Sequence, residues 1–156
     1  MKFLTRSPQQ TRIFAKKIAA LLQPGDILCL TGELGSGKTV FTKGIAWGLG
    51  IAPQEIVSPT FVLLRQYEKA KIPLFHFDLY RVTRERQISE VGYEEYMFDA
   101  GVTVVEWAER LGGLMPGAFL EISLRIVSGK SRELILASHG SRYRALLRKI
   151  NAIIKP

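Results

Sequence analysis

A glycine-rich segment in the first third of the chain carries the residue types of a phosphate-binding loop. Gly32, Gly37, Lys38 and Thr39 satisfy the pattern G-x-x-x-x-G-K-[ST]. These two glycines and Gly35 permit backbone conformations with positive φ, so that successive N–H groups can surround an anion. The lysine is expected to reach the β- and γ-phosphates of a nucleotide, and the threonine hydroxyl is expected to bind Mg²⁺. This spacing predicts a nucleotide-binding site.

The segments on either side of the loop have the character that such a loop requires. An apolar run, Ile27–Thr31, precedes it as a buried strand, and a helix follows it to about Gly48. The start of that helix directs its partial positive charge and its unpaired N–H groups toward a bound anion. We therefore favour a nucleotide site over the alternative, a glycine-rich strand–helix turn that carries a surface lysine.

Two acidic residues follow predicted strands and are candidates to organise Mg²⁺. Asp78 follows residues 74–77, which are apolar except for His76, and Glu106 follows residues 102–105. The carboxyl ends of parallel strands meet at one edge of a sheet, where ligands bind. For each acid the alternative is a solvated carboxylate that ends a strand. His76 is a candidate catalytic base, but a lone histidine in a strand is more often packed or hydrogen-bonded, and we favour that structural role.

Two further features each admit two interpretations. Ser58-Pro59-Thr60 lies between the loop helix and the next predicted strand. A hydroxyl-bearing loop at that place either senses the γ-phosphate as a switch or forms an ordinary proline turn, and the sequence favours neither. Trp107 either covers the nucleotide or packs in the core, and the core is the default interpretation.

The residues alone leave three functions open. The chain has no Asn/Thr-Lys-x-Asp motif, which is usual in guanine-specific members of this class, so ATP and ADP are favoured. A small-molecule kinase needs an arginine-rich lid over the phosphates, and Arg81, Arg84 and Arg86 can supply one. The other two functions are an ATP hydrolase and a module whose bound nucleotide sets its affinity for a partner without hydrolysis.

The pattern of apolar runs and chain breaks predicts an α/β domain. Ser7 and Pro8 begin a helix that Pro24-Gly25 ends, and Ser141–Ile154 forms an amphipathic helix at the end of the chain. Strands are expected at residues 27–31, 60–67, 73–79, 102–106, 119–127 and 133–138, with short helical segments within 81–90, 92–99 and 107–111. We predict one P-loop NTPase domain over residues 1–156, with a central, mostly parallel sheet flanked by helices and with antiparallel edge strands and hairpins.

The composition limits the class of protein. A hydrophobic content of 47% and a charged content of 23% are those of an ordinary soluble globular protein. The sequence has no apolar run long enough to cross a bilayer and no signal peptide, so we expect a cytoplasmic protein with no membrane partner. Cys29 is the single cysteine, which excludes an internal disulfide and fits the cytosol.

The formal net charge of +8 suggests acidic partners such as nucleotide phosphates, tRNA or an acidic protein surface. Several basic residues gather toward the end of the chain. For these we favour a solvated helix face over a direct tRNA contact. They are Arg142, Arg144, Arg148, Lys149 and Lys155.

Four separate motifs, in this order and spacing, resemble one known family. They are GELGSGKT at residues 32–39, SPTF at 58–61, HFDLYR at 76–81 and VEW at 105–107. Together they resemble the TsaE (YjeE) family, small bacterial ATPases required for N6-threonylcarbamoyladenosine (t6A) in ANN-decoding tRNAs. The resemblance extends from about Thr11 to Arg132, which is most of the chain.

The resemblance implies a role for each matching residue. Thr39 and Glu106 would ligate Mg²⁺, with Asp78 as the Walker B acid near the metal and the attacking water, so that catalysis would fall to these acids and Lys38. Ser58-Pro59-Thr60 would be the first switch segment. The residues that would hold the ATP phosphates, or approach the nucleotide in the case of the first and last, are Thr11, Gly35, Ser36, Gly37, Lys38, Thr39, Val40 and Arg132.

The resemblance also implies partners. Members of the family associate with the TsaB–TsaD pair, and their ATP hydrolysis resets that complex between rounds of tRNA modification. The contact with tRNA would then be indirect, through the complex. The chain departs from the family pattern at two places. Arg86-Gln87 stands where an acidic pair is usual, and Val40 stands where a second threonine often follows Thr39.

Overall fold

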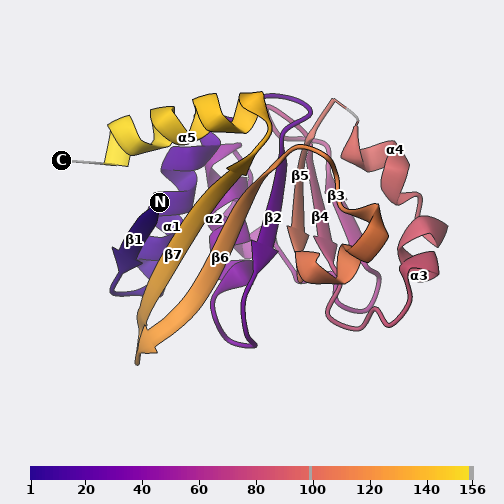
Figure 1. Ribbon diagram of the computed structural model, residues 1–156, viewed down its shortest axis with the longest axis horizontal. Coiled ribbons are helices and arrows are strands. Elements are labelled where there is room, and N and C mark those ends of the chain that lie inside the picture. The colour runs from indigo at the N-terminus through magenta and orange to yellow at the C-terminus, as the bar shows by residue number, and fades with distance from the viewer. Residues whose placement is uncertain (99, 155–156) are drawn as a thin grey trace.

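A seven-stranded sheet separates two layers of helices in the computed structural model, which describes residues 1–98 and 100–154 (Figure 1). The order of the strands across the sheet is β1-β7-β6-β2-β5-β4-β3. Their bounds are β1 Lys2–Thr5, β2 Ile27–Thr31, β3 Leu64–Tyr67, β4 Leu74–Asp78, β5 Val102–Glu106, β6 Phe119–Ser128 and β7 Ser131–His139.

The centre of the sheet is parallel and its edges are antiparallel. Strand β2 pairs in parallel with β5 and β6, and β4 pairs in parallel with β5. The antiparallel pairs are β1–β7, β6–β7 and β3–β4. The arrows of the parallel strands all point toward the bottom of Figure 1, so their carboxyl ends form one edge. The predicted fold class is confirmed.

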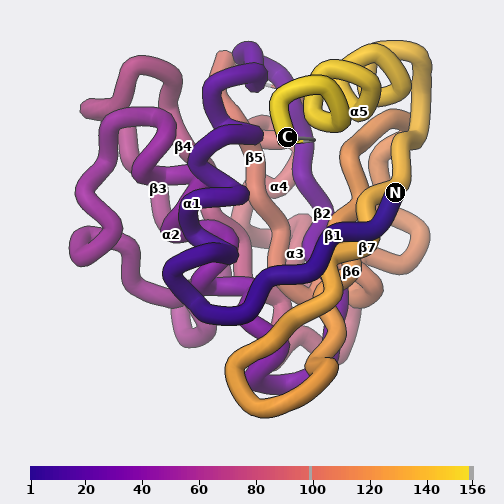
Figure 2. The backbone as a smooth tube through the Cα atoms, turned by 90° about the vertical axis from the view of Figure 1, so that its left-hand side faces the viewer, coloured from indigo at the N-terminus to yellow at the C-terminus, as the bar shows by residue number. Residues whose placement is uncertain are grey.

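Helices cover both faces of this sheet. One face packs against α1 (Pro8–Ala19), α2 (Lys38–Gly48) and α5 (Ser141–Ile154), and Figure 2 shows α1 and α2 side by side. The other face packs against α3 (Glu85–Glu90), α4 (Tyr93–Met97) and the 3₁₀ segment η2 (Ala108–Leu114). A second 3₁₀ turn, η1 (Pro53–Glu55), follows α2. None of the helices among the described residues is long and apolar enough to cross a membrane.

Helix α1 shows how the local sequence determines an element. The Ser7 hydroxyl accepts a hydrogen bond from the Gln10 N–H at 3.1 Å, and Pro8 occupies the first turn, where its missing N–H costs nothing. Phe14 and Ile18, four residues apart, are both buried and direct one face of the helix into the core. The predicted start of the helix is confirmed, and its regular part ends at Ala19, before the predicted end.

One strand prediction needs correction, and one strand was missed. The strand expected from residue 60 begins only at Leu64, because the N–H groups of Val62 and Leu63 bond to the Pro59 carbonyl in a turn and Leu63 has φ of 64°. Strand β1 was not predicted. It has only four residues, and its partner β7 lies at the far end of the chain.

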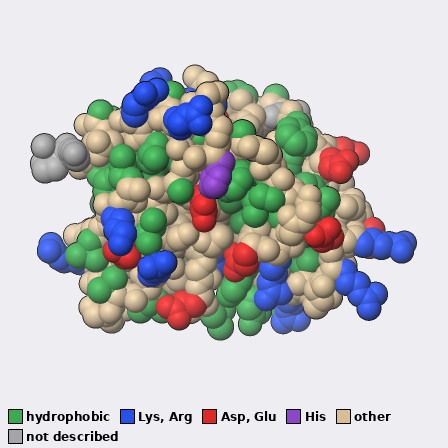
Figure 3. All heavy atoms as spheres, in the orientation of Figure 1, with side chains coloured by type: hydrophobic (Ala, Val, Ile, Leu, Met, Phe, Trp, Pro, Cys, Tyr) green, Lys and Arg blue, Asp and Glu red, His purple; other side chains and the backbone are tan. Residues whose placement is uncertain are grey.

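The basic face predicted for the last helix is smaller than expected. Arg142 is half-buried, and its guanidinium forms an ion pair with the buried Asp26, with Nε 2.9 Å from Oδ1. Arg144, Arg148 and Lys149 are exposed, while Lys155 lies outside the described residues. On the face seen in Figure 3, Lys and Arg side chains are spread over several places, with acidic groups between them. That face presents no single basic patch.

Gly44 lets α1 and α2 approach each other, and we expect Gly44→Ala to lower the free energy of unfolding by about 1–3 kcal/mol. An added Cβ would lie 2.6 Å from the Ala15 Cβ and would overlap the Arg12 carbonyl oxygen, so the two helices must separate. The higher helix propensity of alanine, about 1 kcal/mol, opposes this loss. Urea unfolding measures the change. Gly117→Ala is the control, because its Cβ meets nothing within 4 Å. Equal stability of the two variants would contradict this account of the interface.

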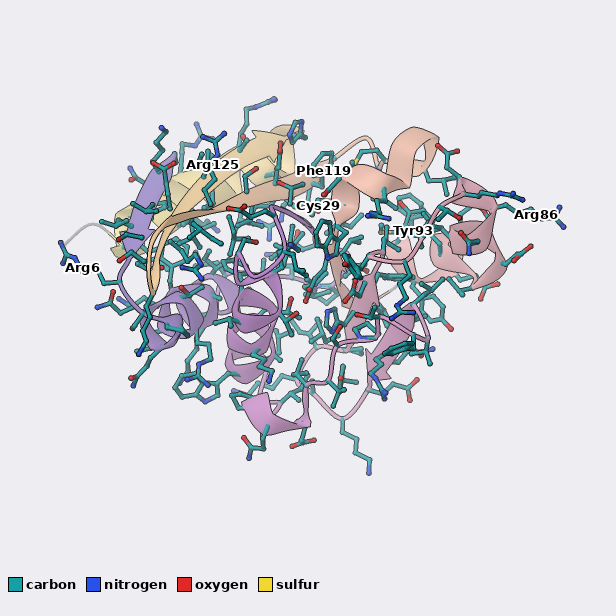
Figure 4. The ribbon with its side chains drawn as sticks, turned by 90° about the horizontal axis from the view of Figure 1, so that it is seen from below. Arg6, Cys29, Arg86, Tyr93, Phe119 and Arg125 are labelled. Atoms are coloured by element: carbon teal, nitrogen blue, oxygen red, sulfur yellow. The ribbon has the colours of Figure 1, made fainter. Side chains whose placement is uncertain are left out.

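Cys29 lies in β2 within the core on the sheet face covered by α3, α4 and η2, together with Tyr93 and Phe119 (Figure 4). Burial raises the pKa of its thiol from 9.0 to about 12, and the charge of Glu121 adds to the shift. The unfolded chain therefore binds fewer protons than the folded chain between these values, and the thiol's contribution to stability is lost as the pH rises through them. We expect the free energy of unfolding to fall between pH 9 and 11, and to fall less steeply in Cys29→Ala. Parallel slopes for the two proteins would contradict this account, because they would show that the thiol ionises as readily in the folded chain as in the unfolded one.

Candidate nucleotide-binding site

A cavity of about 460 Å³ opens at the edge formed by the carboxyl ends of β2, β4 and β5. Figure 4 views the molecule from the side toward which these strands point. The lining comes from the glycine-rich loop, the start of α2, the segment after η1 and the ends of β4 and β5. The lining residues are Leu34, Gly35, Gly37, Lys38, Thr39, Val40, Ser58, Thr60, Phe61, Asp78, Tyr80, Arg81, Glu106 and Trp107.

The glycine-rich loop has the backbone shape that the sequence predicted. Gly32, Gly35 and Gly37 have φ of 139°, 77° and 102°. A Cβ at Gly32 would lie 2.8 Å from the Ser36 hydroxyl and would overlap the Leu124 carbonyl oxygen, so only glycine fits. Helix α2 then begins at Lys38 with no acidic residue in its first turn. The loop and the helix start therefore present N–H groups and positive charge to an anion at the cavity.

Lys38 is held against the loop at the mouth of the cavity. Its Nζ donates hydrogen bonds to the carbonyl oxygens of Gly32 and Glu33 at 2.6 and 3.0 Å, and it lies 3.8 Å from the centre of the Trp107 ring. Burial lowers the pKa of the ammonium, while the nearby carboxylates, Glu106 first among them, act in the opposite direction. The lysine is a donor beside the place where phosphate would bind.

Glu106, at the end of β5, is buried and accepts hydrogen bonds on both carboxylate oxygens. Its Oε2 accepts from the Thr39 hydroxyl at 2.9 Å. Its Oε1 lies 2.9 Å from the Thr42 hydroxyl and 2.8 Å from the His76 Nε2. Thr42 was not predicted from the sequence, although a second hydroxyl three residues after Thr39 lies on the same helix face.

Asp78, at the end of β4, lies in register with Glu106 on the neighbouring strand. Its Oδ2 accepts hydrogen bonds from the hydroxyls of Ser58 and Thr60 at 2.6 and 2.7 Å, and its Oδ1 accepts from the Tyr80 N–H at 3.0 Å. The structure thus brings both candidate acids to one edge and ties residues 58–60 to one of them. The solvated alternative does not describe either acid, because both are buried.

His76 and Trp107 have different relations to this site. His76 is buried within β4 and bonded to Glu106, which agrees with the packed, hydrogen-bonded role that we favoured. Trp107 packs against the core on the sheet face covered by α3, α4 and η2, but it also lines the cavity. There its ring is tilted by 45° against that of Tyr80, with ring centres 5.0 Å apart. The core interpretation alone is therefore incomplete for this residue. Its backbone has φ of 59°, unusual for a residue other than glycine.

Arg132 and Thr11 do not line the cavity. Arg132, on β7, donates hydrogen bonds to the carbonyl oxygens of Ser36 and Gly35, both at 3.1 Å, and so contacts the back of the loop. Thr11 is buried in α1, and its hydroxyl lies 2.8 Å from that of Thr5. Thr5 in turn bonds to the Arg132 carbonyl oxygen at 3.5 Å, which connects Thr11 to the loop only through two intermediates. Gly32, Ser36 and Pro59 shape the segments that line the cavity without lining it.

The three candidate lid arginines do not converge on the cavity. Arg81 lines it, with its guanidinium 4.2 Å from the centre of the Phe61 ring. Arg86 pairs with Glu90 and points outward at the periphery (Figure 4), and Arg84 lines a separate hollow beside it. The arrangement gives no support to the kinase interpretation. In place of the usual acidic pair, the Gln87 side chain accepts hydrogen bonds from the N–H groups of residues 83 and 84 at the start of α3.

The oxygen atoms at the cavity fit Mg²⁺. Among the described residues no group of three or more His, Cys, Asp or Glu side chains could hold a metal by itself. Magnesium bound beside a nucleotide takes only one or two protein ligands and completes its shell with phosphate oxygens and water. The Thr39 hydroxyl and Glu106 Oε2 lie 2.9 Å apart. Neighbouring ligands of an octahedral Mg²⁺, at about 2.1 Å from the metal, are separated by about 3 Å.

Comparisons with known proteins agree with this geometry. The family model described as "Threonylcarbamoyl adenosine biosynthesis protein TsaE" matches residues 5–134. The chain is 38% identical over 151 residues to the tRNA threonylcarbamoyladenosine biosynthesis protein TsaE of Bacillus subtilis (strain 168), with 97% of this chain and 94% of that protein covered. It is 39% identical over 137 residues to the protein of the same name from Treponema pallidum (strain Nichols), with 88% and 100% covered.

A solved structure is similar over the same extent. The crystal structure of YdiB from Bacillus subtilis matches with a TM-score of 0.85 at 35% identity, covering 99% of this chain and 96% of that one. The family match spans the loop, both acids and the segment between them. The chain therefore belongs to the TsaE family of threonylcarbamoyladenosine biosynthesis proteins.

Proposed function

We propose that this protein hydrolyses ATP to drive the cycle of the TsaB–TsaD complex in t6A modification of tRNA. The observation that carries the proposal is the juxtaposition of the glycine-rich loop with the Thr39–Glu106 pair, whose oxygens lie 2.9 Å apart. A binding module needs the loop, but it does not need buried carboxylates at the place where Mg²⁺ and water would meet the γ-phosphate. We treat residues 1–156 as one domain, which the single continuous sheet supports.

The loop and its neighbours hold ATP or ADP in this proposal. Lys38 moves from its loop carbonyls to the β- and γ-phosphates, because an anionic oxygen is a stronger acceptor than a carbonyl oxygen. Arg132 fixes the loop from behind through its carbonyl groups, and Thr11 supports that strand from the core. Gly35, Gly37, Thr39 and Val40 line the cavity and face the phosphates, and Ser36 holds the loop between them in shape.

Thr39 and Glu106 would hold Mg²⁺, with Asp78 beside it. When bound, the metal neutralises charge that develops on the phosphate oxygens. Asp78 accepts two hydroxyl hydrogen bonds on one oxygen, which leaves its other oxygen facing the Tyr80 N–H at the cavity. In this arrangement Asp78 orders the water that attacks the γ-phosphate.

The segment Ser58-Pro59-Thr60 is the proposed switch. Its two hydroxyls bond to Asp78, so a change in the position or the partners of that carboxylate directly alters the hydrogen bonds of the segment. The residues that follow, Phe61 and Val62, are 79% and 54% exposed. Large exposed apolar side chains beside a site favour contact with another protein. We infer that the TsaB–TsaD pair contacts this region in the cytoplasm and that tRNA is reached only through that pair.

The experiment is phosphate release from ATP by the pure protein, alone and with the TsaB–TsaD pair and tRNA added, at several Mg²⁺ concentrations. We expect slow, Mg²⁺-dependent hydrolysis that the pair accelerates. A complex that forms without any hydrolysis would favour the nucleotide-dependent switch module instead. Stoichiometric phosphorylation of an added metabolite would favour the kinase. The absence of both a complex and an acceleration would contradict the proposal.

A further inference from the structure

The two oxygens of the Glu106 carboxylate have different surroundings. Oε2 faces the Thr39 hydroxyl at the cavity. Oε1 points into the protein, toward the Thr42 hydroxyl at 2.9 Å and the His76 Nε2 at 2.8 Å. Thr42 and His76 are both fully buried. We call these two groups the inner donors, because neither lines the cavity.

The inner donors have defined hydrogen-bond roles. A carboxylate can only accept, so the His76 Nε2 must carry a hydrogen. The opposite nitrogen, Nδ1, is buried and has no hydrogen-bond partner within the part of the chain that the structure describes. His76 therefore donates from Nε2 to the Glu106 carboxylate.

Thr42 adds the second donor from a different element. Its hydroxyl lies 3.1 Å from the Lys38 carbonyl oxygen and 2.9 Å from Glu106 Oε1. A hydroxyl has one hydrogen, and an ionised acceptor at the shorter distance makes the stronger bond. Glu106 Oε1 is thus held from β4 by His76 and from α2 by Thr42.

We propose that His76, together with Thr42, is a positioning residue that fixes the Glu106 carboxylate so that Oε2 faces Thr39 and Mg²⁺. This inference rests on the proposed function, in which Glu106 is a metal ligand. The terminal torsion of a glutamate side chain is broad and nearly two-fold, so an unrestrained carboxylate samples many orientations. Groups that orient a ligand from behind in this way typically change metal affinity by 10- to 100-fold.

Two variants of His76 separate orientation from packing. His76→Leu keeps an apolar side chain of similar size but removes the donor. His76→Gln places an amide N–H at about the reach of Nε2 and restores the donor. A residue that only fills space predicts that the leucine variant behaves better than the glutamine variant, because the amide then lies unpaired in the core. A positioning residue predicts the opposite order for Mg²⁺-dependent properties.

The measurement is the affinity of each protein for a non-hydrolysable ATP analogue, by calorimetry, with Mg²⁺ and with chelator. We expect the gain in affinity that Mg²⁺ gives the natural protein to shrink by tenfold or more in His76→Leu and to return largely in His76→Gln. The affinity in chelator should stay within about twofold in all three, because the phosphate loop is untouched. A full Mg²⁺ gain in folded His76→Leu would overturn the positioning role, and so would equal losses in both variants.

Thr42 provides an independent test in case His76→Leu does not fold. Thr42→Val keeps the shape and removes the hydroxyl, while Thr42→Ser keeps the hydroxyl. We expect the Mg²⁺ gain to fall in the valine variant and to persist in the serine variant, and equal gains would overturn the proposal. A natural protein that binds the analogue with no Mg²⁺ gain would overturn the metal site of the proposed function as well. If the natural protein keeps the Mg²⁺ gain and only the variants lose it, the metal site of the proposed function stands and the positioning role is supported.

Discussion

Lys38→Ala is expected to reduce ATP hydrolysis by a factor of about 100 or more, the cost of removing one preorganised donor from developing phosphate charge. The lysine is the one basic side chain from α2 that lines the cavity within the described residues. Nucleotide affinity should fall together with turnover, since the ammonium contacts the phosphates both before and during the reaction. Phosphate release and calorimetric titration of ADP measure the two effects.

The matched control for Lys38→Ala is Lys43→Ala, on the same helix but away from the cavity. It removes the same charge from the protein, so a long-range electrostatic effect would appear in both variants. Folding must be checked, because Lys38 bonds to the carbonyl oxygens of Gly32 and Glu33 and its loss can loosen the loop. Natural turnover by a folded Lys38→Ala protein would mean that ATP is hydrolysed elsewhere.

Glu106→Gln is expected to reduce Mg²⁺-dependent hydrolysis by about 100- to 1,000-fold while the protein remains folded. The glutamine oxygen can accept from the two inner donors, and its N–H₂ group can donate to the Thr39 hydroxyl, which turns its own hydrogen away. The groups that bond to the Glu106 carboxylate then keep a partner, but the charge that attracts the metal is gone. In the presence of chelator, the affinity for nucleotide should be close to that of the natural protein. The gain in affinity that Mg²⁺ gives the natural protein should disappear.

Glu109→Gln is the control for Glu106→Gln. Glu109 is exposed at the start of η2, and its charge also acts on Lys38, yet it does not line the cavity. Turnover should change little in this variant. If Glu106→Gln unfolds in the thermal denaturation assay while Glu109→Gln does not, Glu106 would be assigned to structure and the metal site would need another ligand.

The centre of the site could be predicted because each of its parts has a local signal. The run of apolar residues in β2, the loop glycines and the start of α2 lie within one continuous segment, so their spacing alone specifies the phosphate loop. Asp78 and Glu106 could be predicted because each directly ends a buried strand. The parallel pairing of β4 with β5 then places them opposite each other.

The parts that could not be predicted depend on contacts between distant residues. Strand β1 forms only because β7 offers an edge more than 100 residues later, and four residues carry too little periodicity to indicate a strand. Thr42 lacks a motif of its own and acquires its role only where β5 brings Glu106 to α2. The turn at Leu63, which has positive φ, follows Thr60, Phe61 and Val62, three residues with high strand propensity, so the local pattern indicated the wrong structure.

The most direct measurement is the yield of t6A per TsaD molecule in a reconstituted reaction that contains TsaB, TsaD, tRNA, the threonylcarbamoyl donor and ATP. Since hydrolysis by this protein is proposed to reset the complex between rounds, the natural protein should support many modified tRNAs per TsaD. Glu106→Gln, which binds nucleotide without hydrolysing it, should stop at about one. Repeated rounds with Glu106→Gln at the natural rate would contradict the central claim that ATP hydrolysis at this site drives the cycle.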